Sequence, residues 1–505
     1  MSIRSIGKRW GAGLIVAGLL LQQPMVAAAQ SRDDLEKRIQ ELERKLEKLE
    51  KLERLQSEGV APTKRKVKAP VATVETPAPG AGDEPPAPPV TSTEVKSIVQ
   101  DEIKKQKPLA GWKDGFFLES PGGDFKMKLR GYVQANARWF PNTSGDTGVS
   151  SFYLRRVRPI IEGTMFKYFD YRIMPDFGGT GGTTITTSIQ DAYADVKYFP
   201  YARFRAGKFK EPFSLERLQS GADLLFIERS ISNALAPNRD VGFMLHGDVF
   251  GNGLLEYQLG IFNGVVDGGS TDGDANSDKD FAGRFFVHPF VTTDWDFAKS
   301  FGVGFAGTYG NDSDDPIDGT RVRTDGLSTI YRIASGTVGN GIHSRWSPQF
   351  YYYWGPFGMM GEYIWSDQAG KLTDEEDGTT TKGRFTNDGG FLQASWVLTG
   401  EDASYKRVVP LDNFDPVNGR WGAFEAAVRA STVGLGSAAF DNGLASRSSS
   451  VTNATAYTVG LNWYLNNAFR FQLNYTRTVF SDLIKIDGAQ RSREDVILAE
   501  FQIAY

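Results

Sequence analysis

One stretch of 17 residues constrains the fold of this chain more than any other feature. It reads "DFKMKLRGYVQANARWF", from Asp124 to Phe140, and two kinds of residue alternate along it. The odd positions, from Phe125 to Trp139, are apolar or small, while nearly all of the even positions carry cationic, amide or phenolic side chains. Successive side chains of a strand point to opposite faces, so this segment is one strand with an apolar face and a cationic face. Strands of globular proteins average about 5–6 residues, which makes this ribbon unusually long.

The same alternation returns near the end of the chain. It occurs in "AYTVGLNWYL" (456–465), in "AFRFQLNYTR" (468–477) and in the last residues, where Ile497 to Tyr505 place every second apolar side chain on one face. Loops rich in Gly, Asp, Asn and Ser separate such segments, for example "VVDGGSTDGDANSDKD". Long strands with one apolar face, aromatic residues near strand ends, and alternating short and long connections are typical of a transmembrane β-barrel.

A soluble β-sandwich is the competing architecture, but it does not need polar faces so rich in Arg, Lys and Gln. The aromatic last residue, Tyr505, also favours an outer-membrane barrel. The 382 residues from Asp124 to Tyr505, at roughly 24 residues for each strand with its connection, predict about 16 antiparallel strands. We therefore expect an all-β barrel whose lumen holds water. Its greasy faces meet lipid, and its cationic faces line a pore.

The residues before the barrel divide into three predicted segments. Residues 1–29 have a basic start, a short apolar run and small residues before Gln30, which is typical of a signal peptide. In residues 30–57, apolar side chains from Leu35 to Leu49 are spaced 4-3-4-3, which predicts a coiled-coil helix, although a solvated single helix is the alternative. Residues 58–110 are a Pro- and Ala-rich linker with a short helix, and residues 111–505 form the barrel domain.

Composition excludes several functions. The chain has no cysteine, a net charge of only −4 and three histidines (His246, His288 and His343) that lie far apart in the sequence. Without cysteine there is no thiolate metal site, and a net charge this small gives no signal of nucleic-acid binding. The scattered histidines offer no Ser-His-Asp constellation. We therefore expect neither an enzyme nor a cofactor.

Cationic residues of the barrel wall form the first group of candidate site residues. Arg130 lies on the cationic face of the opening ribbon, and "FYLRRVRPIIEG" follows it. Arg156 and Arg158 share one face of that next strand, so Arg155 cannot point the same way in a regular strand. On the lipid face at mid-membrane an arginine costs about 2–4 kcal/mol. Arg155 is therefore expected near the water-exposed end of the strand, at a bulge or at a subunit contact.

The second group lies in "AGKFKEPFSLERLQSGADLLFIERSISNALAPNRDVG", residues 206–242, which carries Lys208, Lys210, Arg217 and Arg229. Its middle is too irregular for a barrel strand, and connections this long are usually functional. We expect it to fold back into the lumen and narrow the pore.

These motifs, in this order, resemble the phosphate-selective porin family (O/P type) of Gram-negative outer membranes. The resemblance rests on the Arg155–Arg156 pair, "GTMFKYFDYRIMPDF", "GKFKEPFSLER", "FIERS", "DVGFMLHG", "DFAGRFFVHPF" with Arg284, "VLTGE" and "VGLNWYLN". It implies a homotrimer of 16-stranded barrels with a cationic third loop turned inward. Arg155 and Arg156 then look like steps of an anion ladder, and Arg217 and Arg229 fall at the constriction. Tyr132 stands where that ladder has an arginine.

The resemblance implies passage of phosphate or polyphosphate, and other readings remain open. A general or other-anion porin is the nearest alternative, and a stalk that tethers the membrane to peptidoglycan through the N-terminal helix is an alternative of a different class. The expected partners are small anions, outer-membrane lipid and lipopolysaccharide, and two further copies of the chain. The acidic loops around Asp267, Asp280 and Asp314 are interpreted as solvated surface.

Overall fold

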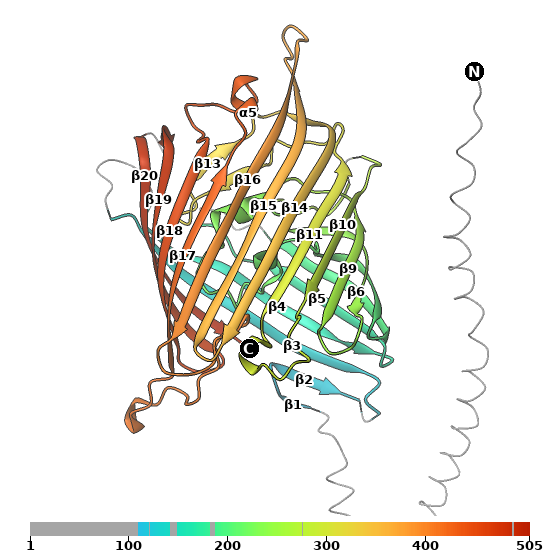
Figure 1. The fold of residues 1–505 in the computed structure, drawn as a ribbon, viewed down its shortest axis with the longest axis vertical. Coiled ribbons are helices and arrows are strands. Elements are labelled where there is room, and N and C mark those ends of the chain that lie inside the picture. The colour runs from blue at the N-terminus through green and yellow to red at the C-terminus, as the bar shows by residue number, and fades with distance from the viewer. Residues whose placement is uncertain (1–109, 121, 142–148, 182–186, 275, 487–488) are drawn as a thin grey trace, which may run out of the picture. The chain divides into compact units, whose positions relative to one another are not determined.

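A computed structural model describes residues 110–505, apart from residues 121, 142–148, 182–186, 275 and 487–488 (Figure 1). The signal peptide, the coiled coil and all but the last residue of the predicted linker lie outside the described residues. Among the residues that are described, no helix has the length and apolar character needed to cross a bilayer.

Sixteen strands form a closed antiparallel barrel. The barrel strands are β3 (Lys126–Trp139), β4 (Ser151–Met165), β5 (Phe169–Asp176), β6 (Ser188–Phe199), β7 (Ala202–Lys210), β8 (Arg239–Asp248), β9 (Leu255–Phe262), β10 (Asp280–Val287), β11 (Gly302–Asn311), β14 (Val338–Trp354), β15 (Phe357–Thr373), β16 (Thr380–Val397), β17 (Ala423–Gly434), β18 (Asn453–Tyr464), β19 (Phe469–Ile486) and β20 (Ala489–Ala504). The strand number predicted from the sequence is confirmed.

The first and last barrel strands pair with each other and close the sheet. In β3 and β20, Val133 lies opposite Ile503 and Ala137 opposite Ala499. The Gly131 N–H donates to the Tyr505 carbonyl at 2.8 Å, and the Tyr505 N–H donates to the Gly131 carbonyl at 2.9 Å. A short hairpin, β1 (Ala110–Trp112) and β2 (Phe116–Glu119), extends the sheet beside the start of β3. Closure leaves no unpaired edge along these barrel strands, as a bilayer requires.

The alternation along β3 sorts its side chains between the two sides of the wall. Leu129 and Trp139 are about two-fifths exposed on the outside of the barrel, whereas Gln134 and Asn136 are almost fully buried on the inside. The greasy side of the opening ribbon therefore faces outward, and its polar side faces the lumen, as predicted.

The lumen is fuller than the sequence suggested, because part of it holds an apolar core. Two extracellular connections turn inward: one carries β12 (Arg321–Arg323) and β13 (Thr329–Arg332), and the other carries the short helix α5 (Ala438–Asp441). Their side chains pack on apolar residues of the wall, including Ile364, Phe385 and Val433. Water is excluded from this side of the barrel, so the path for solutes is narrower than the strand number alone implies.

Two of the acidic side chains that we interpreted as solvated surface are buried, so that interpretation is wrong for them. Asp267 is 3% exposed and accepts a hydrogen bond from the Arg345 Nε at 2.7 Å. Asp280 is 2% exposed, with one oxygen 3.9 Å from the same guanidinium. Both belong to a charged network on the inner wall.

Candidate functional site

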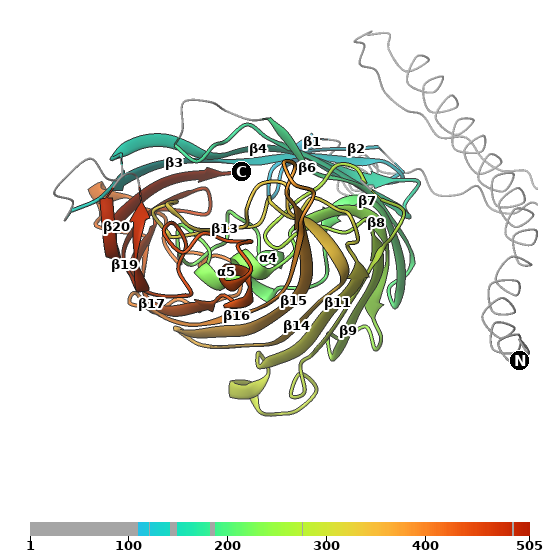
Figure 2. The same cartoon turned by 90° about the horizontal axis from the view of Figure 1, so that it is seen from above.

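The connection from β7 to β8, residues 211–238, lies inside the barrel, as its irregular sequence indicated. Viewed along the barrel in Figure 2, the helix α4 (Leu215–Leu218) lies inside the ring of strands. Pro212 and Pro237 flank the segment and cannot donate to a sheet ladder. The 3-10 helix η1 (Ile231–Leu235) completes the segment, and its apolar side chains join the core described above.

Amide side chains of the wall hold the backbone of this inward loop. Gln134 donates to the Gly221 carbonyl at 2.9 Å, and Gln502 donates to the Ala222 carbonyl at 3.0 Å. Further along the loop, Gln472 donates to the Leu225 carbonyl at 3.0 Å. A buried backbone without regular structure needs such partners, because each unsatisfied polar group costs about 1–3 kcal/mol. Part of the polar lumen face therefore serves to fix the loop.

Two buried carboxylates fix the loop at its helices. Glu362 of β15 accepts hydrogen bonds from the Ser214 hydroxyl and the Leu215 N–H, both at 2.6 Å, at the start of α4. Glu216, on α4, accepts the Ser230 N–H at 3.0 Å and the Ser230 hydroxyl at 2.7 Å, which joins the two halves of the loop.

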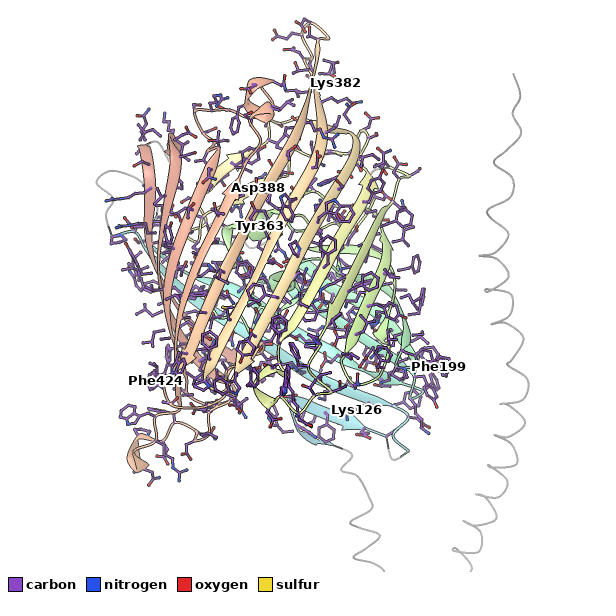
Figure 3. The ribbon with its side chains drawn as sticks, in the orientation of Figure 1. Lys126, Phe199, Tyr363, Lys382, Asp388 and Phe424 are labelled. Carbon is purple, nitrogen blue, oxygen red and sulfur yellow. The ribbon has the colours of Figure 1, made fainter. Side chains whose placement is uncertain are left out.

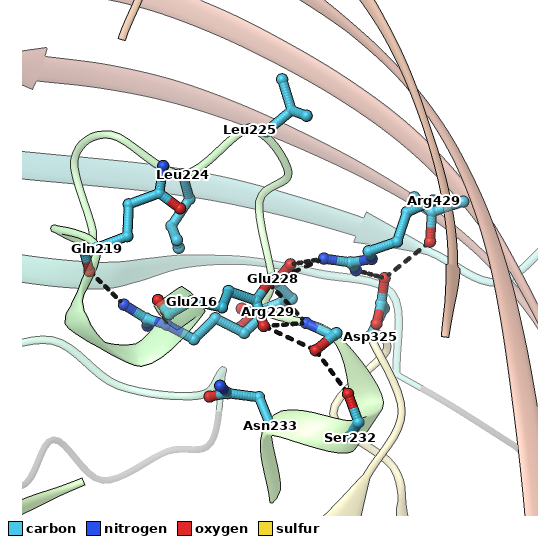
Figure 4. Close-up of polar contacts among 12 residues, drawn as sticks. Glu216, Gln219, Leu224, Leu225, Glu228, Arg229, Ser232, Asn233, Asp325 and Arg429 are labelled. Atoms are coloured by element: carbon cyan, nitrogen blue, oxygen red, sulfur yellow. Dashed lines mark hydrogen bonds and ion pairs between the residues drawn. The ribbon is translucent and has the colours of Figure 1, made fainter. Parts of the chain in front are cut away.

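Arg429 of β17 connects Glu216 to the extracellular connection that carries β12 (Figure 4). Its guanidinium lies 3.4 Å from Glu216, donates to the Glu228 carbonyl at 2.9 Å and donates to Asp325 at 3.0 Å. The inward loop and the extracellular connection that carries β12 are therefore fastened to one wall arginine.

Arg155 and Arg156 both reach the same carboxylate because β4 bulges between them. Gln134 pairs with Arg156 and Ala135 pairs with Leu154, so Arg155 has no partner on β3. Two residues opposing one define a β-bulge, which re-aims a side chain. Arg155 donates to Glu228 at 2.9 Å, and Arg156 lies 3.9 Å from the same carboxylate. Of the three positions expected for Arg155, the structure has the bulge.

Carboxylates neutralise several of the candidate residues on the wall. Arg130 pairs with Glu162 at 3.0 Å, and Arg158 pairs with Asp176 at 2.7 Å. Lys208 pairs with Asp272. An ion pair between neighbours leaves little net field for a passing solute, so these positions attract an anion less than their number suggests.

Three candidate cations, two in the inward loop and Lys210 at the end of β7 just before it, are held by backbone carbonyls instead of carboxylates. Arg217 donates to the Asn233 carbonyl at 2.7 Å. Arg229 donates to the carbonyls of Glu216 at 3.1 Å and Gln219 at 2.9 Å. Lys210 donates to the Leu218 and Gln219 carbonyls at 3.1 Å and 2.9 Å. None of these three cations forms an ion pair with a carboxylate among the described residues, and we call Lys210, Arg217 and Arg229 the loop cations.

Burial and neighbouring charges set the pKa values in the loop. Burial lowers the pKa of the Arg217 guanidinium to about 10, which leaves it charged at neutral pH. Burial lowers the pKa of Arg229 as well, and the positive charge of Arg217 acts in the same direction. For Glu228, burial raises the pKa, but the adjacent Arg155 outweighs it and holds the pKa below the usual value for a glutamate. The negative charge of Glu216 acts against burial on both arginines, since it raises the pKa of Arg217 and of Arg229.

Arg284 is a fourth candidate without a carboxylate partner among the described residues, and it lies apart from the loop. Its Nε donates to Gln349 at 3.0 Å, and the guanidinium stands over the Phe286 ring at 4.5 Å. It therefore adds a positive charge to the wall at β10.

Cavities lie beside the loop cations. One cavity of about 400 Å³ is lined by five arginines: Arg155, Arg217, Arg229, Arg321 and Arg323. Another, of about 250 Å³, is lined by four cations: Arg172, Arg205, Lys210 and Arg239. Carboxylates line each as well, Glu228 and Asp267 in the first and Asp191 in the second. Two cavities therefore adjoin this cationic group, each lined by a different set of residues.

The sequence analysis missed the contribution of Arg321 and Arg323. They stand two positions apart in the "RVR" of β12, so both point to one face of that short strand. That alternation was the available signal, but its place within a long polar connection hid it. The inward turn of the connection brings both arginines to the loop cations.

A closed barrel of 16 strands, narrowed by an internal loop, is the architecture of an outer-membrane porin. The family model for phosphate-selective porin O and P matches residues 125–503. The chain belongs to this family, whose members are channels, and its location is the outer membrane. Porin O of Pseudomonas aeruginosa is 25% identical over 402 residues, which covers 74% of this chain and 88% of that protein.

Two solved outer-membrane proteins are similar to this chain at low sequence identity. An anion-selective porin from Comamonas acidovorans is 12% identical, with a TM-score of 0.46 over 75% of this chain and 100% of its own. OmpT of Vibrio cholerae, with its loop L8 deleted, is 10% identical, with a TM-score of 0.46 over 76% of this chain and 100% of its own.

Proposed function

We propose that this porin forms an anion-selective channel that prefers phosphate or polyphosphate. The observation that carries the proposal is the group of loop cations, none of which forms an ion pair with a carboxylate among the described residues. Arg217 and Arg229 lie on a segment that the barrel wall holds inside the lumen at several points, and Lys210 lies just before it at the end of β7. A positive charge at the narrowest part of a pore attracts anions and repels cations.

The chemistry of the site favours phosphate over smaller anions. An arginine fork binds two oxygens of one phosphate, whereas a lysine acts as a point charge. Because the loop cations are fixed by only some of their donors, the remaining N–H groups are free to serve a passing oxyanion. The arginines of the neighbouring cavities offer further weak sites, and conduction requires several moderate sites instead of one tight site. The name of the family, phosphate-selective porin O and P, agrees with this preference.

Single-channel recordings of the wild-type protein test the proposal. In a potassium chloride gradient, the reversal potential should show that chloride carries most of the current. Added phosphate should reduce that current in a saturable way, because it occupies the same sites for longer. A channel selective for potassium would overturn the proposal. Anion selectivity without block by phosphate would favour the alternative of a general or other-anion porin.

We also propose that the protein is a homotrimer, assisted by the predicted helix of residues 30–57. The resemblance and the heptad spacing from Leu35 to Leu49 support this. Chemical crosslinking of the detergent-extracted protein should give a trimer band, and deletion of residues 30–57 should weaken that band without removing it. A protein that runs only as a monomer would contradict the trimer. Loss of cell-wall attachment with unchanged channel currents would instead support the tethering role of the N-terminal segment.

A further inference from the structure

A groove of about 590 Å³ crosses the outer face of the barrel wall from β14 to β18. Its floor consists of small residues, among them Gly361, Gly390 and Ala430, and its sides include Leu392 and Tyr457. The last two side chains are about half exposed, which places the groove on the outward face of the wall. Missing side-chain volume on successive strands, between larger apolar neighbours, creates the hollow.

The strand register shows where the groove leads. Gly361 lies opposite Leu392, which lies opposite Ala430, and Ala430 lies opposite Tyr457, so these residues form one row across four strands. The same row continues on β19 and β20. Tyr457 lies opposite Arg477 there, and Arg477 lies opposite Asp495. Neighbouring strands are about 4.8 Å apart, so a guanidinium stands one strand beyond the end of the apolar trough.

The adjacent row ends in the same way. Thr432 and Thr455 are paired in the groove, Thr455 lies opposite Val479, and Val479 lies opposite Arg493. Arg477 and Arg493 are therefore neighbours on β19 and β20, beyond the β18 end of the groove.

One carboxylate serves both of these arginines. The Arg477 Nε is 2.7 Å and the Arg493 Nε is 3.5 Å from Asp495, which also accepts the Tyr475 hydroxyl at 2.7 Å. Two positive charges against one negative charge leave the cluster positive. The Arg477 and Arg493 side chains are 44% and 56% exposed, so each can turn unused N–H donors to a ligand outside the wall.

This cluster lies toward the extracellular end of the barrel. The short turns at residues 355–356 and 465–468 and the C-terminus lie at the opposite, periplasmic end (Figure 1). Arg477 is eight residues along β19 from Phe469, at the periplasmic end of that strand. In a tilted strand this corresponds to roughly 20 Å of height, near the top of an apolar band about 25 Å tall. Tyr363 and Asp388, which hydrogen-bond to each other, also lie in the upper half of the barrel (Figure 3).

We propose that this outer face binds lipopolysaccharide, with a lipid phosphate on Arg477 and Arg493 and one acyl chain in the groove. A positive cluster at the level of the outer head groups, joined to an apolar trough below it, fits an amphiphile with an anionic head. Lipopolysaccharide is the phosphorylated lipid of the outer leaflet, where the cluster lies. A second protein copy offers no comparable match, since it would cover two arginines as well as the trough. The inference depends on the outer-membrane location and not on anion selectivity.

Native mass spectrometry of the detergent-purified protein measures the lipopolysaccharide that each chain retains. The double variant Arg477→Gln/Arg493→Gln should lower that amount about fivefold, as expected for two half-exposed charge pairs. Ala430→Phe, which fills the groove without touching the cluster, should lower it similarly. The matched controls are Arg420→Gln, at an exposed arginine of a periplasmic turn, and Ala194→Phe, at an outward alanine of β6. Both controls should retain wild-type amounts.

Channel recordings on the same variants separate this site from the pore. The reversal potential should stay at its wild-type value in all four, because none of these side chains lies in the lumen. Lipopolysaccharide stripped of its phosphates should be retained no better by the wild type than by the double variant. Equal retention in every variant would overturn the proposal, and so would retention of glycerophospholipids that depends equally on the same residues. An oligomer lost in Ala430→Phe, with lipid retention unchanged, would assign the groove to a second copy instead.

Discussion

Arg217→Glu is expected to abolish the anion preference of the channel or to reverse it. Arg217 is held by the Asn233 carbonyl and forms no ion pair with a carboxylate among the described residues, so its charge acts more strongly on the pore than that of a paired wall arginine. At an effective dielectric constant of 20, two unit charges 4 Å apart interact by about 4 kcal/mol. Reversal of one charge should therefore lower the ratio of anion to cation permeability by at least about tenfold. Reversal potentials in a salt gradient measure this ratio, and block by phosphate should disappear with it.

Two further variants separate the charge of Arg217 from its place in the loop. Arg217→Gln removes the charge and retains an amide donor for the Asn233 carbonyl, so it should give an intermediate permeability ratio. Arg130→Glu makes the same change of charge on the barrel wall, outside the inward loop, so its effect on selectivity should be smaller. An Arg217→Glu channel with wild-type selectivity would show that the loop cations are not the filter.

The barrel could be predicted from the sequence because its signal is local. Alternation along Phe125 to Trp139 sets which side chains face lipid, and the residue count sets the strand number. The position of residues 211–238 followed from a different local signal, the loss of alternation between two strands. Each of these inferences depends only on residues that are close in the sequence. The alternation of apolar and polar side chains was therefore sufficient to predict the strands and the inward loop.

The balance of charge at the site could not be predicted, because it depends on pairs that are distant in sequence. Arg155 and Glu228 are 73 residues apart, and Arg429 and Glu216 are 213 apart, so only the folded chain shows which cations are neutralised. The same holds for the amides of the wall. Gln472 stands on the polar face of its strand, and only the folded chain shows that it donates to the Leu225 carbonyl. The sequence could indicate a cationic lumen but could not separate the loop cations from the neutralised arginines.

Release of the inward loop is the second large effect that we expect, and Glu216→Ala should produce it. The Glu216 carboxylate accepts both the N–H and the hydroxyl of Ser230 and lies 3.4 Å from Arg429. Removal of one partner of a buried charged network costs about 3–5 kcal/mol. The barrel strands keep their own ladders, so this cost falls on the loop. The single-channel conductance should therefore rise, with increased current noise, while the amount of folded barrel stays the same.

The direction of the change in selectivity distinguishes loop release from simple electrostatics. Loss of a negative charge beside the loop cations would by itself make the channel more anion-selective. Release of the loop predicts the opposite, because the loop cations then leave the constriction and the pore widens. Glu216→Gln provides the matched control, since its amide oxygen can still accept from Ser230 while the charge is lost. We expect Glu216→Ala to be wide and weakly selective, and Glu216→Gln to be narrow and at least as anion-selective as the wild type. If both variants became more anion-selective at unchanged conductance, Glu216 would act only through its charge, and the wall contacts of Glu362 and the lumen amides would be sufficient to hold the loop.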